Sequence, residues 1–330
     1  MKYIVNNSND PRYNLAFEEY CFKQLSKDES YVILWINGPA IIVGKNQNTI
    51  EEVNSDYVDE NNIKVVRRVT GGGAVYHDLG NLNFSIIISA PGSEKIDFKK
   101  YNIPILKSLE KLGLNCELSG RNDMTLDGKK FSGIAQSVWK GRVLNHGTLL
   151  FDTKLDVLSS ALNVKQDKIE SKGIKSVKSR VTNIKEYLTD DVNIFEFRDL
   201  LLNHIFGMED LTPEEYKLSE EELEGVQKLF DEKYSTWEWN YGESPRSNYK
   251  NYKRYDFGSV DIRFNVLNGL IEDIKIYGDF FGTEDVSLLQ EKLNGARYDK
   301  TEVAKVIEDE PIEKYFGNIS KEAFVELMFQ

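Results

Sequence analysis

Three observations predict an α+β fold with a large domain followed by a smaller one. The 330 residues include 40% hydrophobic side chains, enough to bury a sizeable core without disulfide support. Segments with strand-like and helix-like periodicity are interleaved along the chain and do not fall into separate blocks. A polar stretch at residues 243–251 lacks periodicity and contains a proline, which is typical of a linker. We therefore divide the chain into domains at residues 1–246 and 250–330.

The first half of the chain predicts one amphipathic helix followed by short strands and further helices. Asp10 and Pro11 form the pattern of a helix cap with proline in the first turn. Apolar side chains then recur at roughly helical spacing at Leu15, Phe17, Cys21 and Leu25. We expect strands at residues 31–37, 40–44, 64–69 and 81–89, and helices at residues 51–62 and 98–113.

The second half begins with a predicted meander of three strands over residues 122–151. Asp127-Gly128 and Lys140-Gly141 are typical of tight hairpin turns, and they divide this stretch. Helices are expected next at residues 194–207 and 219–234, before an aromatic cluster at 237–242. The C-terminal module should contain a hairpin around residues 267–269, with strands at 259–266 and 270–278 and helices at 284–294, 301–309 and 321–330.

Composition and charge restrict the class of protein. A net charge of −12 disfavours broad contact with nucleic acid or an anionic membrane, but it leaves room for a local basic site for a small anion. The N-terminus lacks the apolar core of a signal peptide, and no stretch approaches the roughly 18 apolar residues of a membrane span. Cys21 and Cys116 are too few for a disulfide framework, so we expect buried, reduced thiols. These features favour a cytoplasmic protein.

The most informative segment begins at Arg67 and contains three consecutive glycines, residues 71–73, after a β-branched strand. Glycine lets the backbone approach a ligand and point successive N–H groups at an anion, while Arg67 and Arg68 can offer paired donors to phosphate or carboxylate. The combination favours a nucleotide phosphate site. A glycine-rich hairpin with solvent-facing arginines is the alternative. The spacing fits neither a P-loop nor a dinucleotide-binding fingerprint.

A second candidate site follows at residues 129–133. Side chains alternate along a strand, so if Phe131 enters the core, Lys130 and Ser132 face the opposite side, while Lys129 near the turn reaches solvent. A lysine in a dry pocket could hold a carboxylate against a phosphate and offset the charge that develops during transfer. The residues alone leave open that Lys130 is simply solvated.

Other polar residues have less specific patterns. Asn122 and Asp123 offer oxygen atoms suited to Mg²⁺ or to a nucleotide, with a side-chain-capped turn as the alternative. His77 and His146 lack metal-binding spacing, and we interpret them as pocket-wall or turn residues, with substrate contact as the alternative. The basic stretch at residues 172–181 is by itself typical of a solvated loop.

Four motifs in this order resemble the lipoate-protein ligase A family: RRVTGGGAVYHDLGN, GRNDMTLDGKKFSG, NHGTLLFD and KGIKSVKSRVTN. The resemblance continues through WEWNYG into the C-terminal module, so it covers essentially the whole chain. Thr70 stands where serine is frequent in the family, and this departure keeps a hydroxyl group. The resemblance implies a large domain of the biotin/lipoyl ligase fold and a small C-terminal accessory domain that changes position during the reaction cycle.

The resemblance also implies roles for individual residues. Lys130 would be the catalytic residue, because the functional lysine of the family directly precedes an apolar-Ser-Gly triplet, and Asp123 would bind Mg²⁺. Residues expected to bind ATP or lipoyl-AMP are Arg68, Gly72, Gly73, Ala74, Val75, Tyr76, Asn122, Asp123, Lys130, Ser132, Gly133 and His146. A loop expected to close over the adenylate carries Lys172, Gly173, Ser176 and Arg180.

The implied activity is ATP-dependent and Mg²⁺-dependent ligation of lipoate. Lipoate and ATP would form lipoyl-AMP, which would then acylate a lysine of an apo lipoyl domain, in the E2 subunits of 2-oxoacid dehydrogenases or in the glycine cleavage H protein. An ATP-independent octanoyl or lipoyl transferase of the same fold is the main alternative, although Cys116 has no activated setting. A biotin-protein ligase would need a GRGR-type loop, and a repressor would need a helix-turn-helix for which the N-terminus has no room.

Overall fold

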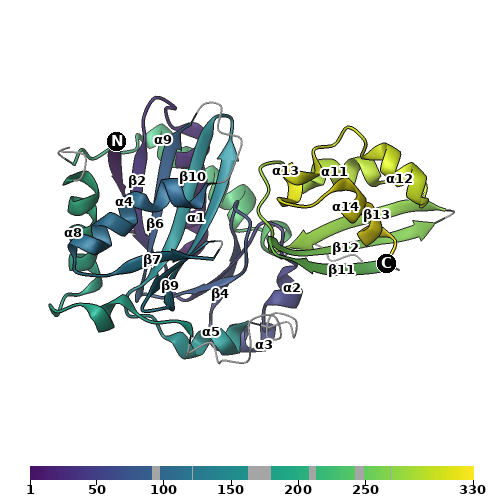
Figure 1. Ribbon diagram of the computed structural model, residues 1–330. Coiled ribbons are helices and arrows are strands. Elements are labelled where there is room, and N and C mark those ends of the chain that lie inside the picture. Colours follow the sequence, from purple (N-terminus) through teal and green to yellow (C-terminus); the bar gives the residue numbers. More distant parts are fainter. Residues whose placement is uncertain (91–96, 121, 163–179, 208–212, 242–248, 268) are drawn as a thin grey trace. The chain divides into compact units, whose positions relative to one another are not determined.

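The computed structural model describes residues 1–90, 97–120, 122–162, 180–207, 213–241, 249–267 and 269–330. They form two units, each with its own hydrophobic core (Figure 1). The first unit spans residues 1–43, 49–68 and 74–241, and the second contains residues 44–48, 69–73 and the described residues after Tyr241. Two short loops from the first third of the chain therefore belong to the C-terminal unit.

The first long helix begins where the sequence supplies a cap. The Asp10 carboxylate accepts a hydrogen bond from the Arg12 backbone N–H at 2.9 Å, and Pro11 starts α1 (Pro11–Gln24). The predicted cap is confirmed. The buried side of this helix carries Asn14 and Glu18 alongside its apolar residues, so α1 brings polar groups into the interior.

A mixed seven-stranded sheet dominates the first unit. Its strands in spatial order are β1 (Lys2–Val5), β2 (Tyr31–Ile36), β6 (Asn81–Ser89), β10 (Arg142–Leu150), β9 (Lys129–Trp139), β8 (Asp123–Leu126) and β7 (Cys116–Ser119). The β1 and β2 strands pair in parallel, and the other neighbours pair antiparallel. The turn residues Asp127, Gly128, Lys140 and Gly141 have φ of 49°, 75°, 46° and 77°. These are tight-hairpin values, so the predicted meander is confirmed.

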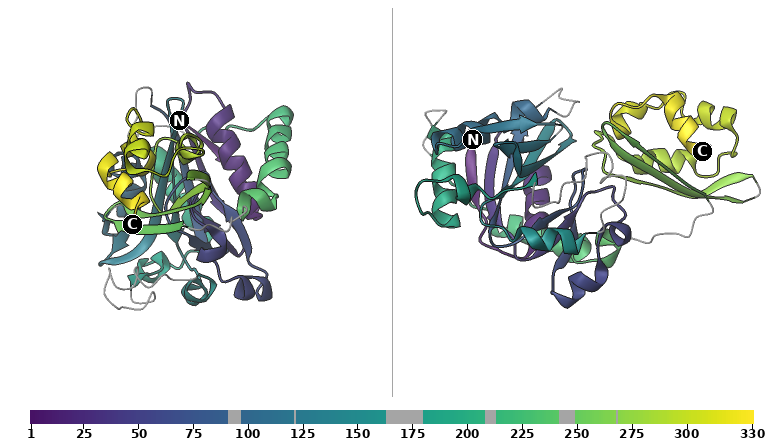
Figure 2. Two further views of the ribbon diagram at one scale, coloured as in Figure 1. Left: turned by 90° about the vertical axis from the view of Figure 1, so that its right-hand side faces the viewer. Right: turned by 60° about the horizontal axis from the view of Figure 1, so that its bottom comes forward.

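One face of this sheet is apolar. Two helices, α4 (Phe98–Lys111) and α8 (Ile194–Gly207), cover it, as Figures 1 and 2 show from different sides. The rings of Phe84, Phe131 and Phe197 are completely buried between the sheet and these helices. Both helices were predicted, and their apolar sides supply this core.

A smaller sheet and α1 lie against the opposite face. The small sheet has the order β4 (Lys64–Arg67), β3 (Ala40–Val43) and β5 (Val75–His77). Its far side packs against α2 (Thr49–Glu52), α3 (Ser55–Glu60) and α5 (Leu155–Ala161). The single helix predicted at residues 51–62 is wrong, because the Asn54 side chain caps a separate second helix by accepting from the Tyr57 N–H. β5 is too short to show a period, and the sequence did not predict it.

The remaining elements of the first unit follow η1 (Ile184–Tyr187). They are α9 (Glu220–Leu229), the π-helical turn η2 (Phe230–Tyr234) and α10 (Trp237–Asn240). The helix predicted at residues 219–234 is confirmed. Trp239 donates from Nε1 to the Arg67 backbone oxygen at 2.8 Å, so the aromatic cluster packs against β4.

The second unit is an antiparallel three-stranded sheet with helices packed on one face. Its strands are β11 (Tyr249–Tyr255), β12 (Gly258–Leu267) and β13 (Leu270–Gly278), and its helices are α11 (Val286–Leu293), α12 (Lys300–Val306), α13 (Ile312–Phe316) and α14 (Lys321–Met328). The predicted hairpin of β12 and β13 is confirmed. Residues 249–251 were predicted as part of the linker, but they begin β11. The prediction is wrong here because the polar sequence of this edge strand lacks the apolar residues that indicate a strand. Residues 243–248 of that linker lie outside the described residues.

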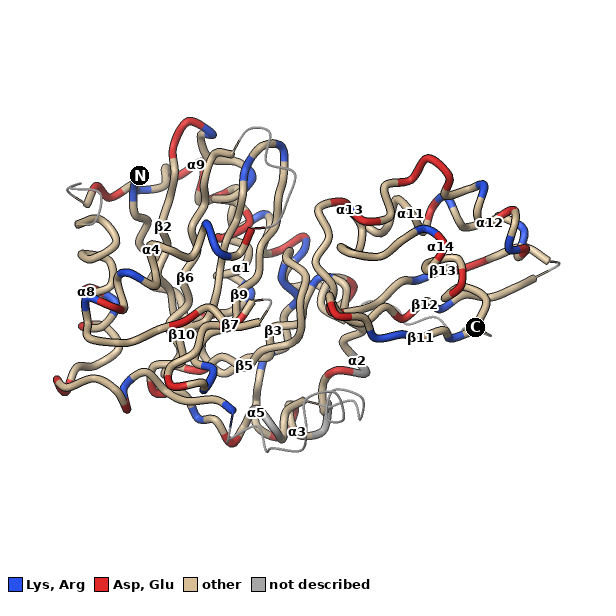
Figure 3. Tube along the Cα trace, in the orientation of Figure 1, with Lys and Arg blue, Asp and Glu red and all other residues tan. Residues whose placement is uncertain are grey.

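The α+β class is confirmed. Lysine and arginine are interspersed with aspartate and glutamate along the trace of both units, as Figure 3 shows. Among the described residues, no helix combines the length and apolar character needed to cross a lipid bilayer.

Candidate active site

Polar side chains gather on the face of the large sheet that α1 and the small sheet cover. Along β6, alternate residues enter the apolar core, and those between them face the other way and are buried too. The buried polar ones are Asn81, Asn83 and Ser85. β10 places His146 opposite Ser85 and Thr148 opposite Asn83. Because opposite residues of an antiparallel pair share a face, these side chains form one polar strip.

Lys130 reaches this face because of a β-bulge. Phe131 is an extra residue in the ladder between β8 and β9, and its ring is completely buried in the apolar core. Lys130 lies on the opposite face with its Nζ above Gly133, where a Cβ would come within 3.2 Å of the amine. Lys129 is exposed beside the turn. The predicted orientations of the two lysines and of Phe131 are confirmed.

The same bulge reverses the expected orientation of Ser132. Strict alternation predicts that it faces the same side as Lys130, but it pairs with Met124, which belongs to the apolar core. Ser132 is completely buried, and its Oγ has no hydrogen-bond partner among the described residues. The predicted orientation of the Ser132 side chain is therefore wrong, because one extra residue shifts the alternation.

Lys130 forms an ion pair with Asp123 at the start of β8, with 2.7 Å between Nζ and Oδ1. Their side chains are 36% and 29% exposed, so the pair remains accessible to a ligand. Asn122 beside it donates from Nδ2 to the Ile134 backbone oxygen at 2.6 Å, and its Oδ1 is the atom suited to contact a nucleotide. In the described part of the chain, no three His, Cys, Asp or Glu side chains gather to hold a metal ion by themselves.

A buried network that the sequence analysis missed lies between the polar strip and α1. Glu18 Oε1 accepts a hydrogen bond from Ser85 Oγ and lies 2.8 Å from His146 Nδ1. Trp35 Nε1 donates to Ser85 Oγ at 2.9 Å. The sequence carried a signal for this network: position 18 lies three residues from two apolar positions of the helical stripe, which places a carboxylate on the buried side.

Arg68 and His77 enter the same interior from the small sheet. Arg68 is buried and donates from Nη1 to the Ile42 backbone oxygen at 3.1 Å. Burial lowers the pKa of Arg68 to about 10, which leaves the guanidinium charged at neutral pH. Burial, with the nearby charges of Arg68 and His146, lowers the pKa of His77 to about 3, so its imidazole is neutral. Its ring contacts Trp35 edge to face.

Arg67, the other predicted donor for an anion, has a structural role. Its guanidinium donates to the Trp239 backbone oxygen at 2.8 Å and to Thr49 Oγ1 at 2.7 Å. These bonds fasten α10 and the start of α2 to β4. The expectation that both arginines bind an anion is therefore wrong for Arg67, because backbone and hydroxyl oxygens engage its donors.

The three glycines lie in the second unit, and packing explains two of them. A Cβ on Gly71 would come within 2.3 Å of the Phe280 backbone oxygen, and Gly72 has a left-handed φ of 92°. The Gly72 N–H donates to the same Phe280 oxygen at 3.4 Å. The N–H predicted to face a phosphate is therefore engaged by the protein itself. A Cβ on Gly73 would meet nothing within 4 Å, so packing does not explain that glycine.

The residues after the glycines return to the first unit. Ala74 and Val75 are half-buried, and the ring of Tyr76 lies in the small-sheet core. Burial raises the pKa of Tyr76 to about 12. A nucleotide contact from Tyr76 would therefore come from its backbone.

The predicted adenylate loop lies largely outside the described residues, which include neither Lys172, Gly173 nor Ser176. Arg180 is described and half-buried at the point where the chain returns. Next to it, the Thr182 N–H donates to the Lys130 backbone oxygen at 2.9 Å. A hollow of about 400 Å³ opens here, with Thr182 and Lys129 in its lining. The C-terminal end of the loop is thus attached beside Lys130.

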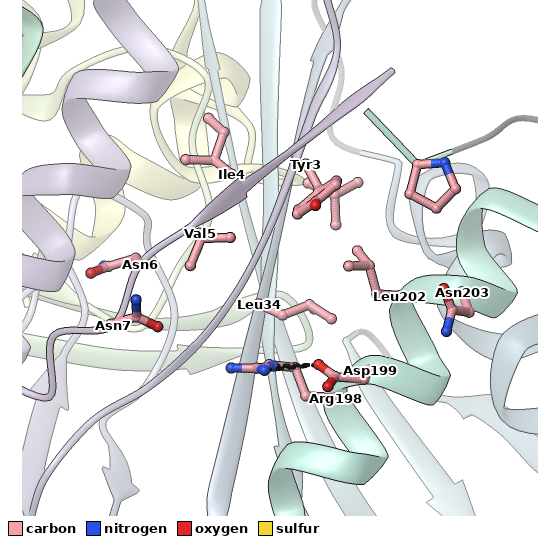
Figure 4. A pocket seen from close by; sticks show the side chains of 12 residues that line it. Tyr3, Ile4, Val5, Asn6, Asn7, Leu34, Arg198, Asp199, Leu202 and Asn203 are labelled. Atoms are coloured by element: carbon pink, nitrogen blue, oxygen red, sulfur yellow. Dashed lines mark hydrogen bonds and ion pairs between the residues drawn. The ribbon is translucent and has the colours of Figure 1, made fainter. Parts of the chain in front are cut away.

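Another hollow, of about 420 Å³, lies between β1 and α8 (Figure 4). Leu34 of β2, which belongs to the apolar core, contributes to its wall, and an Arg198–Asp199 ion pair borders it at 2.8 Å. The described residues that line it include none of the predicted site residues. The polar strip, and not this groove, therefore contains the candidate chemistry.

Both cysteines are buried free thiols. Burial raises the pKa of Cys21, and it raises the pKa of Cys116 to about 12. Cys116 lies in the apolar core, away from the polar strip. A thiol in such surroundings is a poor nucleophile, which argues against an acyl-cysteine mechanism.

Family models and relatives match the chain over its full length. A model of the lipoyl protein ligase A/B catalytic domain matches residues 10–206, and one of the bacterial lipoate protein ligase C-terminus matches residues 244–328. Lipoate-protein ligase LplJ of Bacillus subtilis is 52% identical over 331 residues, with 100% of both chains covered. Lipoate–protein ligase 1 of Staphylococcus aureus is 48% identical over 329 residues, covering 99% of this chain and 100% of that one.

Solved structures resemble the chain as well. Plasmodium falciparum LipL1 in complex with lipoate has a TM-score of 0.75 at 27% identity, covering 93% of this chain and 94% of that one. A bi-partite lipoate protein ligase of Thermoplasma acidophilum, described with its E2 lipoyl domain, has a TM-score of 0.66 at 34% identity, covering 75% and 98%. A lipoate-protein ligase A bound with ATP has a TM-score of 0.64 at 32% identity, covering 73% and 98%.

Proposed function

This chain belongs to the lipoate-protein ligase family, as its motifs predicted, and we propose how its residues share the work of this ATP-dependent ligase. In the first step, a lipoate oxygen attacks the α-phosphorus of ATP, the bond to the bridging oxygen breaks, and pyrophosphate leaves. In the second step, a lysine amine of the acceptor attacks the acyl carbon of lipoyl-AMP. The acyl–phosphate bond breaks, AMP leaves, and the amine loses a proton.

Lys130 acts on the first step. The observation that carries this role is its position on the polar face, with its amine held by Asp123 and extended over Gly133. A positioned ammonium group draws the carboxylate and the α-phosphate together, although both are negatively charged. It also offsets the charge that grows on the phosphoryl oxygens in the transition state.

Four further contacts complete the adenylate site. Arg68 supplies a second, buried positive charge for the carboxylate or phosphate. The backbone from Gly73 to Tyr76 approaches the phosphates, which gives a reason for a glycine that packing does not explain. Asn122 contacts the nucleotide through Oδ1, and His146, held by the Glu18 carboxylate, borders the acyl group.

Asp123 is the residue suited to hold Mg²⁺. Magnesium commonly takes one or two carboxylates and completes its shell with water and substrate phosphates, and a single accessible carboxylate beside Lys130 fits that pattern. The ion would neutralise phosphate charge when bound.

The acceptor is a lysine on an apo lipoyl domain, of an E2 subunit or of the glycine cleavage H protein. The Thermoplasma neighbour described with its E2 lipoyl domain supports the first class. We place this reaction in the cytoplasm, where ATP is abundant and buried thiols such as Cys21 and Cys116 stay reduced.

The region from residue 250 to 330 is an accessory domain for adenylation, and residues 1–246 form the catalytic domain. Lys45 forms a 2.8 Å ion pair with Asp285, and the Gly278 N–H donates to the Asn46 backbone oxygen at 2.6 Å. Together with the Gly72–Phe280 hydrogen bond, these contacts support control of the glycine loop by C-terminal residues. The loop carrying Lys172, Gly173, Ser176 and Arg180 then excludes water from the adenylate.

Truncation after residue 246 tests the accessory role. The truncated enzyme should form lipoyl-AMP slowly, yet it should still transfer the lipoyl group from lipoyl-AMP supplied ready-made. Full rates in both half-reactions would remove the accessory role.

Lys130→Ala tests the central proposal. It should slow pyrophosphate release from lipoate and ATP, measured without acceptor, by about 10² to 10³-fold, which corresponds to about 2.7 to 4 kcal/mol. Circular dichroism and thermal unfolding should match those of the unchanged enzyme, because the side chain is partly exposed.

Lys129→Ala is the matched control, since it removes the same amine from the exposed neighbouring position. Its rate should change by less than about threefold. A silent Lys130→Ala variant together with an inactive Lys129→Ala variant would show that the wrong lysine has been assigned.

A further inference from the structure

A chain of buried amides connects α1 to His77. Asn14 Nδ2 donates to the backbone oxygens of Ser8 and Ile36, at 2.9 and 3.2 Å, and to Asn37 Oδ1 at 2.8 Å. Asn37 Nδ2 lies 3.0 Å from His77 Nδ1. Asn14 and Asn37 are 1% and 0% exposed, so this chain is shielded from solvent.

The direction of these hydrogen bonds fixes the tautomer of His77. Backbone carbonyls can only accept, so the Asn14 atom that contacts two of them is the amide nitrogen. Asn37 must then present its oxygen to Asn14 and its nitrogen to His77. A neutral imidazole that accepts at Nδ1 carries its proton at Nε2.

The Nε2–H group of His77 has no hydrogen-bond partner among the described residues, although the side chain is only 4% exposed. Folded proteins rarely leave a buried donor without an acceptor. The ring lies close to Trp35, Arg68 and His146, which belong to the candidate site. An acceptor atom of a bound ligand would satisfy this donor.

We propose that His77, held as the Nε2–H tautomer by Asn37, donates a hydrogen bond to a carboxylate oxygen of lipoate near the Arg68 guanidinium. The inference rests on the ligase function proposed above. A neutral imidazole orients the carboxylate without giving it a proton, so the attacking oxygen stays ionised. After adenylation the donor holds the acyl carbonyl oxygen. Asn37 touches no substrate and is a positioning residue.

Two substitutions at residue 77 distinguish the effect of losing the hydrogen-bond donor from the effect of changing the packing. His77→Asn keeps an acceptor where Nδ1 meets Asn37 but has no donor at the Nε2 position, whereas His77→Gln places an amide N–H near that position. His77→Asn should lower kcat/KM for lipoate roughly 10- to 100-fold in pyrophosphate release, the loss of one hydrogen bond to a charged group. His77→Gln should stay within about fivefold of the unchanged enzyme.

Kinetic parameters measured separately for lipoate and for ATP show whether His77 donates to a lipoate oxygen or to a phosphate oxygen. The KM for ATP should stay within about twofold in His77→Asn. A selective rise of that KM would overturn the assignment to lipoate, and equal activity of both variants would overturn the donor role. If the unchanged enzyme released no pyrophosphate with lipoate, the proposed function itself would fail, a result separate from either.

Asn37→Asp tests the positioning role. A carboxylate there accepts from Nδ1–H and favours the imidazolium, against the burial and the charges of Arg68 and His146 that lower the pKa of His77 in the unchanged protein. As pH rises through the increased pKa of His77, the ring keeps its proton at Nδ1 and loses the Nε2 donor. The kcat/KM for lipoate should therefore fall with rising pH in Asn37→Asp, relative to the unchanged enzyme at the same pH.

Nitrogen-15 NMR of labelled histidine reads the tautomer directly, and a chain with only 3 histidines makes assignment by substitution simple. The unchanged protein should show His77 protonated at Nε2, and Asn37→Asp should show it at Nδ1 at high pH. An Nδ1–H form in the unchanged protein would overturn the proposal.

Discussion

Phe84 and Ser85 are neighbours on β6, yet their side chains lie on opposite faces of the seven-stranded sheet and in different surroundings. Phe84 packs into the apolar core under α4 and α8. Ser85 donates to Glu18 and accepts from Trp35. Both residues are completely buried, so exposure does not distinguish them.

The two faces differ in the kinds of interaction that their side chains can form with a ligand. The apolar face is held by contacts that a substrate would only disrupt. The polar face is held by hydrogen bonds and charges, which a carboxylate or a phosphate can also make. Substitutions at neighbouring positions should therefore separate stability from catalysis.

The largest expected effect is on the apolar face. Phe84→Ala should lower the free energy of unfolding by about 3 to 5 kcal/mol, measured by urea denaturation, because it leaves a cavity. Gly147, which lies opposite, has no side chain that could fill it. Ser85→Ala, one residue along, should cost about 1 to 3 kcal/mol and should also impair kcat/KM for lipoate. An equal loss of unfolding free energy in both variants would contradict the proposed difference between the two faces.

A smaller effect on stability is expected for substitution of Glu19, one of two neighbouring glutamates in α1. Glu18 faces the polar strip, whereas Glu19 binds Lys23 at 2.7 Å and Lys233 at 2.8 Å. Burial opposes ionisation of Glu19, but the two lysines outweigh it and hold its pKa below the ordinary 4.5. The folded state therefore gains stability from ionised Glu19 above pH 4.5, and loses it as pH falls through the lowered pKa.

Glu19→Gln should accordingly lower unfolding free energy by about 1.5 to 3 kcal/mol at pH 7. This difference from the unchanged protein should shrink as the pH is lowered below the folded-state pKa. Urea unfolding at several pH values checks it, with adenylation rates as the control. A constant difference at every pH would mean that the charge of Glu19 is irrelevant.

The smallest effect is expected at Cys116, which lies in the apolar core with a raised pKa. Cys116→Ser should change lipoyl transfer per folded molecule by less than about twofold, because the thiol is no nucleophile. Intact mass of an acceptor domain, with and without ATP, provides the measurement. ATP-independent transfer that disappears in this variant would favour the transferase mechanism.

The sequence predicted what depends on local pattern. The cap at Asp10 and the turns at Asp127-Gly128 and Lys140-Gly141 follow from single residues with strong preferences, and the structure confirms them. It missed β1, β5 and β11, because three or four residues show too little periodicity and YKNYKRY looks like a polar loop.

The site was harder to predict, because its members meet only in three dimensions. Glu18 and Ser85 come from a helix and a strand that are 67 residues apart. The engagement of Gly72 by Phe280 depends on residues of the far end of the chain. The orientation of Ser132 depends on a bulge, which no period-two pattern reveals.

The β-bulge at Phe131 also determines which residues of β9 lie on the same face of the sheet. Lys130 and Gly133 are an odd number of positions apart, and in a regular strand they would lie on opposite faces. Phe131 is the additional residue that brings them onto one face, and Ala135, opposite His146, lies there too. A one-residue deletion or insertion between Lys130 and Gly133 would separate the lysine from the polar strip while preserving every residue of that strip. Any transplant of this active site into another scaffold must therefore copy the spacing of the strand as well as its chemical groups.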